Sequence, residues 1–349
     1  MLLQTLLIIM FILYVRSYYI DHFSDYKSIT VTPQPAIYDK IIINTLGKDS
    51  LHNKIAHNIS KIYPIDTIKN MYSEIECLKR NNSNINHISI VSNNAFEYFN
   101  EKNKDNNLRF ISSIGTEKLT LITPYNSKIL AWSNLNNKNI GVLKNRPSQK
   151  YNLDMLLKNL NIRANILDID ESKISEALQN GRVDAFFMII SHPSKLIKNV
   201  NKKIPIKFID IENIDSDILK KVYPLNNMSS IDITEYNLIS EKNIKTIDFK
   251  ISIVAHKDLS NINTYNLVKT LFSNFIYLKT DGDTYYKKTM MYLSPSSLYP
   301  NNSMYILHSG VKKYFYEVGI ISYSNDYSCR YSVGIKPCID KNLNFFRLL

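Results

Sequence analysis

The sequence predicts an α/β fold, and three features of residues 170–196 carry the prediction: a capped helix, a tight turn and a buried strand. Asp170 or Ser172 can cap the helix, and Gly181 stands where a left-handed residue ends one. The buried helix face consists of Ile174, Ala177 and Leu178. Residues 183–190 are too short for another helix and too apolar for a half-exposed strand, so we expect a central strand covered on both faces.

This strand ends in the polar turn Ser191-His192-Pro193-Ser194. Open α/β sheets bind ligands at the carboxyl ends of their strands, so the turn is a candidate ligand contact. The alternative is an ordinary strand exit, and the residues leave both interpretations open.

The pattern of the other segments agrees with alternating strands and helices. Strands are expected at 38–45, 85–92, 108–115, 118–124, 140–143, 166–169, 208–211 and 249–256. Helices are expected from Asp49 or Ser50 onward, and at 74–79, 151–159, 219–223 and 264–278. Residues 21–37 contain Pro33 and Pro35 and are expected to form a linker.

The composition bounds the class of protein. With 349 residues and 44% hydrophobic content, the chain can bury a large core, and two lobes are the natural expectation. Lys+Arg 43 against Asp+Glu 31 gives a net charge of +12, but the lysines are scattered among asparagines. Nucleic-acid binding needs a basic patch, so no nucleic-acid partner is expected.

The N-terminal segment indicates that the rest of the chain lies outside the cytoplasm. Residues 2–15 are apolar apart from Gln4, and Arg16 follows at once. The run is shorter than the ~20 residues of a spanning helix and fits a signal peptide, with an uncleaved anchor as the alternative. Cys329 and Cys338 could form a disulfide or remain two thiols, whereas Cys77 lies in a helical pattern and is expected to be buried and alone.

Two motifs resemble a known family. Residues 180–187, Asn-Gly-Arg-Val-Asp-Ala-Phe-Phe, with a proline six residues later, resemble the "G-x-(I/V)-D-A-F-F" segment of the TAXI family, the extracytoplasmic solute-binding proteins of TRAP-type transporters. Residues 307–319, LHSGVKKYFYEVG, resemble that family's "L-H-P-G-A-x-x-Y-Y-x-E-x-G", with Ser309 in place of the proline. Weaker echoes lie at 74–78, 88–94 and 135–140. The likeness extends over roughly residues 40 to 320.

The resemblance implies a two-lobed fold of the type II periplasmic-binding-protein kind, with two strands crossing a hinge. The expected domains are a signal peptide or anchor at 1–20, a linker at 21–37, lobe I at 38–124 and 251–320, lobe II at 125–250 and a tail at 321–349. It also implies a small organic solute, a carboxylate or an amino acid, held in the cleft between the lobes. The implied partner is a TRAP-type permease, and the implied location is the periplasm or cell surface.

The chain departs from this family at both glycine-rich loops. The first loop is here Asn44-Thr45-Leu46-Gly47-Lys48-Asp49-Ser50, with a single glycine, and the second contains Arg146-Pro147-Ser148. Glycines in such loops let backbone N–H groups converge on an anion. A backbone anion site is therefore not expected here, and the Arg146 guanidinium can replace it with a bidentate contact to a carboxylate.

The expected ligand contacts form a polar ring at the strand ends. They are Thr45, Gly47, Lys48, Ser73, Glu76, Asn93 and Asn94 in the first lobe, and Arg146, Ser148, Ser191 and His192 in the second. For each of them, a solvated loop residue is the alternative.

Motifs for catalysis or cofactors are missing from the sequence. It contains no G-x-x-x-x-G-K-[ST], no G-x-G-x-x-G, no H-E-x-x-H and no G-x-S-x-G. His52 and His57 would lie on different helix faces, so no metal site is expected from them. We expect a binding protein without a cofactor rather than an enzyme. A degenerate relative that acts as a surface interaction protein is the second hypothesis, and a hydrolase is a distant third.

Overall fold

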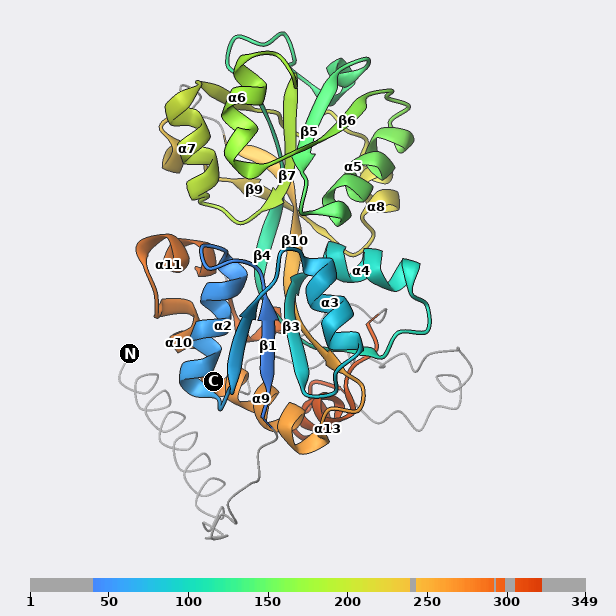
Figure 1. Ribbon diagram of the computed structural model, residues 1–349, viewed down its shortest axis with the longest axis vertical. Coiled ribbons are helices and arrows are strands. Elements are labelled where there is room, and N and C mark those ends of the chain that lie inside the picture. The colour runs from blue at the N-terminus through green and yellow to red at the C-terminus, as the bar shows by residue number, and fades with distance from the viewer. Residues whose placement is uncertain (1–39, 239–242, 292, 299–304, 322–349) are drawn as a thin grey trace, which may run out of the picture. The chain divides into compact units, whose positions relative to one another are not determined.

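A computed structural model describes residues 40–238, 243–291, 293–298 and 305–321. The described residues belong to one compact unit. Figure 1 labels the elements of the chain. The boundaries of lobe I and lobe II are not tested by this structure and remain predictions.

Three parallel strands form what we call the first half-sheet, in the order β2-β1-β3. They are β1 (Ile42–Thr45), β2 (Thr67–Asn70) and β3 (His87–Ser92). The helices that follow these strands are α2 (Leu51–Ile62), α3 (Glu74–Asn82) and α4 (Asn93–Lys102). Ser50 and Ser73 cap α2 and α3 through their side chains, as their positions before apolar helical patterns require.

Three more parallel strands form the second half-sheet, in the order β6-β5-β7. They are β5 (Asn139–Leu143), β6 (Asn165–Ile169) and β7 (Ala185–Ile190). The accompanying helices are η1 (Trp132–Leu135), α5 (Pro147–Asn159), η2 (Glu171–Lys173), α6 (Ile174–Gln179), α7 (Lys195–Lys203) and α8 (Ser216–Val222).

Two long antiparallel strands, β4 (Leu108–Pro124) and β10 (Ile244–His256), run from one half-sheet into the other (Figure 1). β10 pairs with β3 and β4 pairs with β7, so the two crossing strands join both halves into one sheet. The short strands β8 (Ile206–Phe208) and β9 (Asn227–Ile231) pair with β4 and β10, and η3 (Thr234–Tyr236) follows β9. The predicted α/β fold with two crossing strands is confirmed.

Each half-sheet has its own apolar core. One cluster of buried residues surrounds the first half-sheet and includes Ile43, Ile90 and Phe315. The second half-sheet separates two clusters, with Phe187 in one and Phe186 in the other. Both phenylalanines are fully buried, because neighbouring residues of a strand point to opposite faces. The prediction that β7 is covered on both faces is confirmed.

The C-terminal helices complete the first core. They are α9 (Asn261–Ser273), α10 (Phe275–Thr280), α11 (Thr284–Met290), α12 (Pro295–Leu298) and α13 (Ser309–Glu317). His308 precedes α13, and its Nδ1 accepts a hydrogen bond from Gly310 N and contacts Thr264 Oγ1 at 2.9 Å. A Cβ on Gly310 would collide with Asn261 O and Thr264 Oγ1 on α9. The "L-H-S-G" segment therefore lets α13 approach α9 closely.

Several predicted boundaries were wrong. Residues 108–115 and 118–124 belong to one strand, because Gly115 to Lys118 stay in register with β10 despite their turn-like composition. The helix predicted at 264–278 is interrupted at Asn274, which is the C-cap of α9 and the N-cap of α10. Two strands, β2 and β9, were missed, and so were the helices α4, α7, α11, α12 and α13. β2 and β9 are largely exposed and polar, and so lack the apolar alternation by which a strand is recognised.

Other predictions concern single segments. Cys77 is a buried free thiol, as expected, and Gly181 has the predicted positive φ of 72°. Within the described ranges, no helix is long and apolar enough to cross a membrane. The segment at 2–15, the linker at 21–37, Cys329 and Cys338 lie outside the described residues.

Candidate functional site

Four ionisable side chains from both halves meet at the carboxyl ends of the strands. Glu74 begins α3, His52 lies on α2, Glu117 lies on β4 and Arg146 precedes α5. We call this group the acid–arginine cluster. Its side chains are between 1% and 11% exposed. Buried charges are costly unless paired and gather at functional sites, so this cluster is the candidate site.

Glu74 is the best-satisfied member of the cluster. Its Oε2 accepts a hydrogen bond from Arg146 Nη1 at 2.8 Å. Its Oε1 accepts from Ser92 N at 2.6 Å and from Ser92 Oγ at 2.8 Å, and lies 3.3 Å from His52 Nε2. Burial alone would raise the pKa of Glu74, but the Arg146 guanidinium and the His52 ring hold it well below its usual range. Glu74 is therefore ionised and already holds the arginine.

Glu117 is much less compensated. Its Oε1 lies 4.0 Å from Arg146 Nη1, and its Oε2 has no hydrogen-bond partner among the described residues. Burial raises the pKa of Glu117 to about 6, although His52 and Arg146 act in the opposite direction. At neutral pH this carboxylate carries a buried negative charge that the cluster only partly balances.

The local sequence explains why Arg146 can cross to the other half. Pro147 is the first residue of α5, where its missing N–H costs nothing. Arg146 occupies the N-cap position, but its side chain makes no capping hydrogen bond. The guanidinium is therefore free to reach Glu74. Burial acts to lower the pKa of Arg146, but the charges of Glu74 and Glu117 outweigh it and leave that pKa raised.

The two halves also touch on either side of the cluster. On one side the Tyr151 hydroxyl of α5 donates to Glu101 of α4, and the Tyr98 and Tyr151 rings lie 5.2 Å apart. On the other, Lys198 of α7 lies over the Tyr285 ring of α11, with 4.8 Å between its Nζ and the ring centroid. Lys288 of α11 pairs with Glu235 of η3. These contacts hold the half-sheets together around the cluster.

Several buried polar atoms near the strand ends have no hydrogen-bond partner in the part of the chain that the structure describes. They are Thr45 Oγ1, Asn94 Nδ2, Ser148 Oγ, Gln149 Oε1 and Ser191 Oγ, together with Glu117 Oε2. Ser191 directly follows Ile190, which pairs with Lys118, so it lies beside Glu117 in the sheet. Buried polar groups are almost always hydrogen-bonded, and such a concentration is typical of a site that receives a polar ligand.

The predicted ligand contacts divide into two groups. Thr45, Asn94, Ser148 and Ser191 are buried next to the ends of strands, and the Arg146 side chain is 11% exposed and contacts Glu74 of the other half. Others serve the scaffold. Ser73 caps α3, Glu76 Oε2 accepts from Tyr72 N, and Asn93 Oδ1 accepts from Ser252 Oγ. Gly47 and Lys48 are exposed in the turn after β1.

His192 lies in a structural network. Its Nε2 is 2.8 Å from Thr120 Oγ1, and its Nδ1 is 2.6 Å from the Tyr236 hydroxyl, which accepts from Ser194 N at 2.7 Å. Burial, followed by the nearby charge of Lys118, lowers the pKa of His192 to about 3. Both ring nitrogens are thus occupied by neutral partners, and the ring fixes the turn after β7.

His52, Glu74 and Glu117 were not predicted from the sequence as site residues. No local signal marked Glu117, because it lies within Gly115 to Lys118, a stretch whose composition is that of a turn. His52, Glu74 and Glu117 also offer ligand atoms that lie within 4.8 Å of one another, which is a geometry that could hold a metal ion. The Arg146 guanidinium already supplies positive charge there, so a metal would have to displace it.

The profile of the NMT1-like family matches residues 86–319. A search of the curated proteins found no match to the chain.

One similar solved structure comes from work on glutathione import by GshT and the cystine importer TcyBC of Streptococcus mutans. It is 12% identical, has a TM-score of 0.47, and the match covers 73% of this chain and 96% of that chain. Another is the amino acid ABC transporter substrate-binding protein AbpA from Streptococcus pneumoniae bound to L-arginine, at 16% identity and a TM-score of 0.45, covering 72% and 94%. At these identities and TM-scores, the two structures say nothing about the function of this chain.

Proposed function

Because the chain belongs to the NMT1-like family, we propose that it is an extracytoplasmic solute-binding protein, which receives a small organic solute between its half-sheets and presents it to a membrane transporter. The observation that carries the proposal is the acid–arginine cluster with its neighbouring unpartnered polar atoms. It lies where the carboxyl ends of both sets of parallel strands meet, which is where open α/β sheets bind ligands.

The cluster favours an amino acid or a related amine over a simple carboxylate. Arg146 already donates to Glu74, which balances part of its charge, and a carboxylate bound to its other N–H groups would approach the negative charge of Glu117. An ammonium group would instead neutralise Glu117, whose Oε2 has no hydrogen-bond partner among the described residues. The hydroxyls of Thr45, Ser148 and Ser191 and the Asn94 amide are neutral donors suited to the carboxylate of such a solute.

The transporter type rests on the sequence resemblance. The segments at 180–187 and 307–319 resemble the TAXI family, so the proposed partner is a TRAP-type permease. In this proposal the segment at 1–20 exports or anchors the chain, and lobe I (38–124 and 251–320) and lobe II (125–250) close on the solute. Bending within the crossing strands would allow that closure.

Thermal-shift and calorimetric titration of the purified chain would test this function. The probes are the common amino acids, simple amines and dicarboxylates. A solute present at 100 times its Kd should stabilise the protein by about 2.7 kcal/mol. Binding of amino acids or amines but not of dicarboxylates would support the proposal, and binding of dicarboxylates alone would contradict the assigned solute class.

Two variants locate the charged contact. Glu117→Gln should weaken binding of an amino acid about tenfold or more, because a charged hydrogen bond contributes about 1.5–3 kcal/mol. For a solute held mainly by its carboxylate, affinity should instead fall from Arg146 to Lys to Ala, as the bidentate fork and then the charge are lost. Glu176→Gln removes an exposed carboxylate that pairs with Lys173 and serves as the control.

A second candidate is an interaction protein that has lost solute binding. The observation that favours it is the pairing of Arg146 with Glu74. In this pair the Glu74 carboxylate of the chain itself takes the place that a solute's carboxylate would take beside the arginine. If no amino acid, amine or dicarboxylate shifts the melting temperature of the wild-type chain, this second candidate replaces the first.

A further inference from the structure

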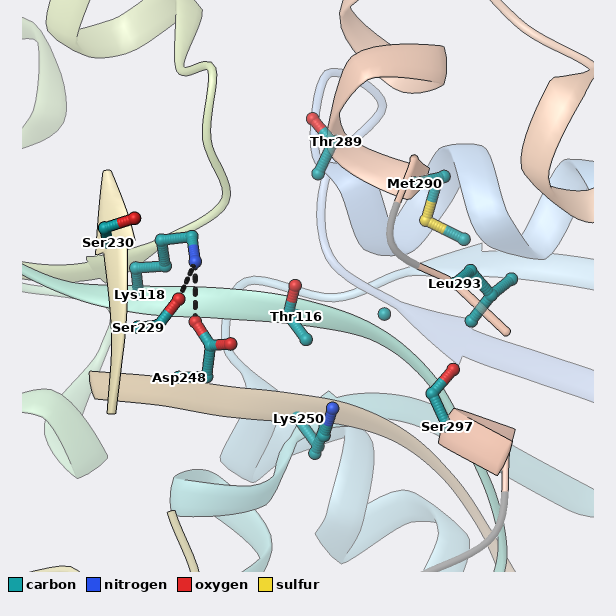
Figure 2. A pocket seen from close by; sticks show the side chains of 11 residues that line it. Thr116, Lys118, Ser229, Ser230, Asp248, Lys250, Thr289, Met290, Leu293 and Ser297 are labelled. Carbon is teal, nitrogen blue, oxygen red and sulfur yellow. Dashed lines mark hydrogen bonds and ion pairs between the residues drawn. The ribbon is translucent and has the colours of Figure 1, made fainter. Parts of the chain in front are cut away.

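A second candidate site is a cavity of about 400 Å³ beside the middle of the crossing strands (Figure 2). Lys118 and Asp248 are among its lining residues, and so are Lys250 and Ser229. None of the residues predicted from the sequence to bind a ligand lines this cavity. The cavity also shares no lining residue with the acid–arginine cluster.

The strand register shows that it is separate in space as well. Lys118 pairs with Asp248 and Thr116 pairs with Lys250, and residues paired directly across two strands share a face of the sheet. Glu117 pairs with Phe249 and so projects from the opposite face. Figure 2 shows Thr116, Lys118, Asp248 and Lys250 turned toward the cavity.

The charges around the cavity do not balance. Lys118 Nζ forms an ion pair with Asp248 Oδ1 at 2.7 Å and also contacts Ser229 Oγ. Lys250 makes no hydrogen bond or ion pair with any described residue. Burial lowers the pKa of its ammonium group. Two lysines thus face one aspartate, and the surplus positive charge is on Lys250.

The remaining lining supplies neutral donors and contact to both halves. Hydroxyl groups come from Thr116, Ser229, Ser230, Thr289 and Ser297. Ser229 and Ser230 belong to β9, which pairs with the first residues of β10, Ile244 to Asp248. Thr289 and Met290 belong to α11, which packs on the first core. A group bound here would contact elements from both sides of the crossing.

We propose that this cavity is a binding site for a small oxyanion, a phosphate or a carboxylate, held by the Lys250 ammonium and the surrounding hydroxyl groups. An unpaired lysine ringed by hydroxyls suits an acceptor-only group that needs several donors. Since its walls come from both halves, occupation of the cavity stabilises one arrangement of the crossing strands.

The test is titration of the full chain with inorganic phosphate and, in a second series, with citrate, each against sodium chloride at equal ionic strength. Calorimetry and melting temperature are the measurements. Tighter phosphate binding identifies a phosphate group as the ligand, and tighter citrate binding identifies a carboxylate. Equal melting temperatures in phosphate, citrate and chloride, together with no heat of binding, overturn the proposal.

The matched variants are Lys250→Met and Lys128→Met. Lys128 is exposed in the loop after β4, so its substitution controls for the loss of one charge. Lys250→Met should weaken the bound anion about tenfold or more, and Lys128→Met should leave it unchanged. Equal affinity in both variants would contradict the assignment.

Should Lys250→Met fail to fold, Thr116→Val tests the same site through one hydroxyl and should weaken the anion severalfold. Unchanged affinity in Thr116→Val would then count against the site. Glu117→Gln should not alter anion binding, so failure here is distinguishable from failure of the proposed solute site.

Discussion

The two half-sheets share one topology but carry opposite charge where they meet. Each has three parallel strands, in the orders β2-β1-β3 and β6-β5-β7, followed by an antiparallel crossing strand. At the strand ends the first half supplies Glu74 and the second supplies Arg146. The strand order is the same in both halves, but the acid comes from one half and the arginine from the other. The side chains at the strand ends therefore decide the function, and the fold does not.

The halves differ in their cover as well. The first core includes α9 to α13, which the chain adds after it returns along β10. The second half-sheet instead has two clusters, one on each face, built from its own connecting helices. The first half therefore needs both ends of the described chain, while the second is nearly continuous in sequence.

The largest expected effect comes from a charge placed in the third parallel strand of either half. Phe186 in β7 and Ile90 in β3 are both 0% exposed. Phe186→Asp and Ile90→Asp each bury an unpaired carboxylate, and each should destabilise the protein by more than about 4 kcal/mol. Circular dichroism on heating should show no cooperative transition for either variant.

This pair also tests how independent the halves are. The crossing strands connect both cores, so we expect one cooperative unit in which either substitution unfolds everything. A Phe186→Asp protein that keeps a protease-resistant fragment containing the first core would show that the halves fold separately.

A smaller effect is expected from breaking the ion pair that joins the halves. Glu74→Gln leaves the buried Arg146 poorly compensated, and Arg146→Met leaves two buried carboxylates without their cation. Each should cost about 3–5 kcal/mol in the free energy of unfolding. The double variant should cost less than the sum, because it removes both charges of the pair. Urea denaturation of the four proteins measures the coupling.

Strictly additive losses would mean that Glu74 and Arg146 do not act as a pair. Lys158→Met, which removes a surface pair with Asp154, should change stability by no more than about 0.5 kcal/mol and controls for loss of charge.

The sequence predicts the alternating fold well because its signals are local. The helix before Gly181 and the apolar strand after it need only neighbouring residues to be recognised. Arg146 was predicted as a site residue, but its contact with Glu74 depends on the order of strands in the sheet. Periodicity cannot reveal that order, so Glu74 and Glu117 were missed, and Arg146 was expected to contact a ligand instead of a buried glutamate.

A helix contact that only the first half possesses gives the third prediction. Gly310→Ala places a methyl group against the backbone of α9, including Tyr265 N at 2.9 Å. Overpacking of this kind typically costs about 1–3 kcal/mol, and rigid backbone puts this site near the upper end. Gly47→Ala is the matched control, because a Cβ there meets nothing within 4 Å. Equal melting temperatures for both variants would show that α13 can move away from α9.

The smallest expected effect concerns Glu117, the acid that the second half's arginine compensates least. Its pKa is raised from 4.5 to about 6, so the folded state binds more protons than the unfolded state between those values. Stability therefore falls as pH rises through this window, and the loss is complete above it. Glu117→Gln removes the buried charge and should match the wild type at pH 4 but be more stable at pH 7, by on the order of 2 kcal/mol. Urea denaturation at the two pH values measures the difference.

Glu117→Gln distinguishes two roles for this acid. If the variant is more stable at pH 7 and yet binds its solute more weakly, the chain keeps Glu117 for recognition at a cost in stability. If the variant is less stable at pH 7, Glu117 supports the pairing of the halves.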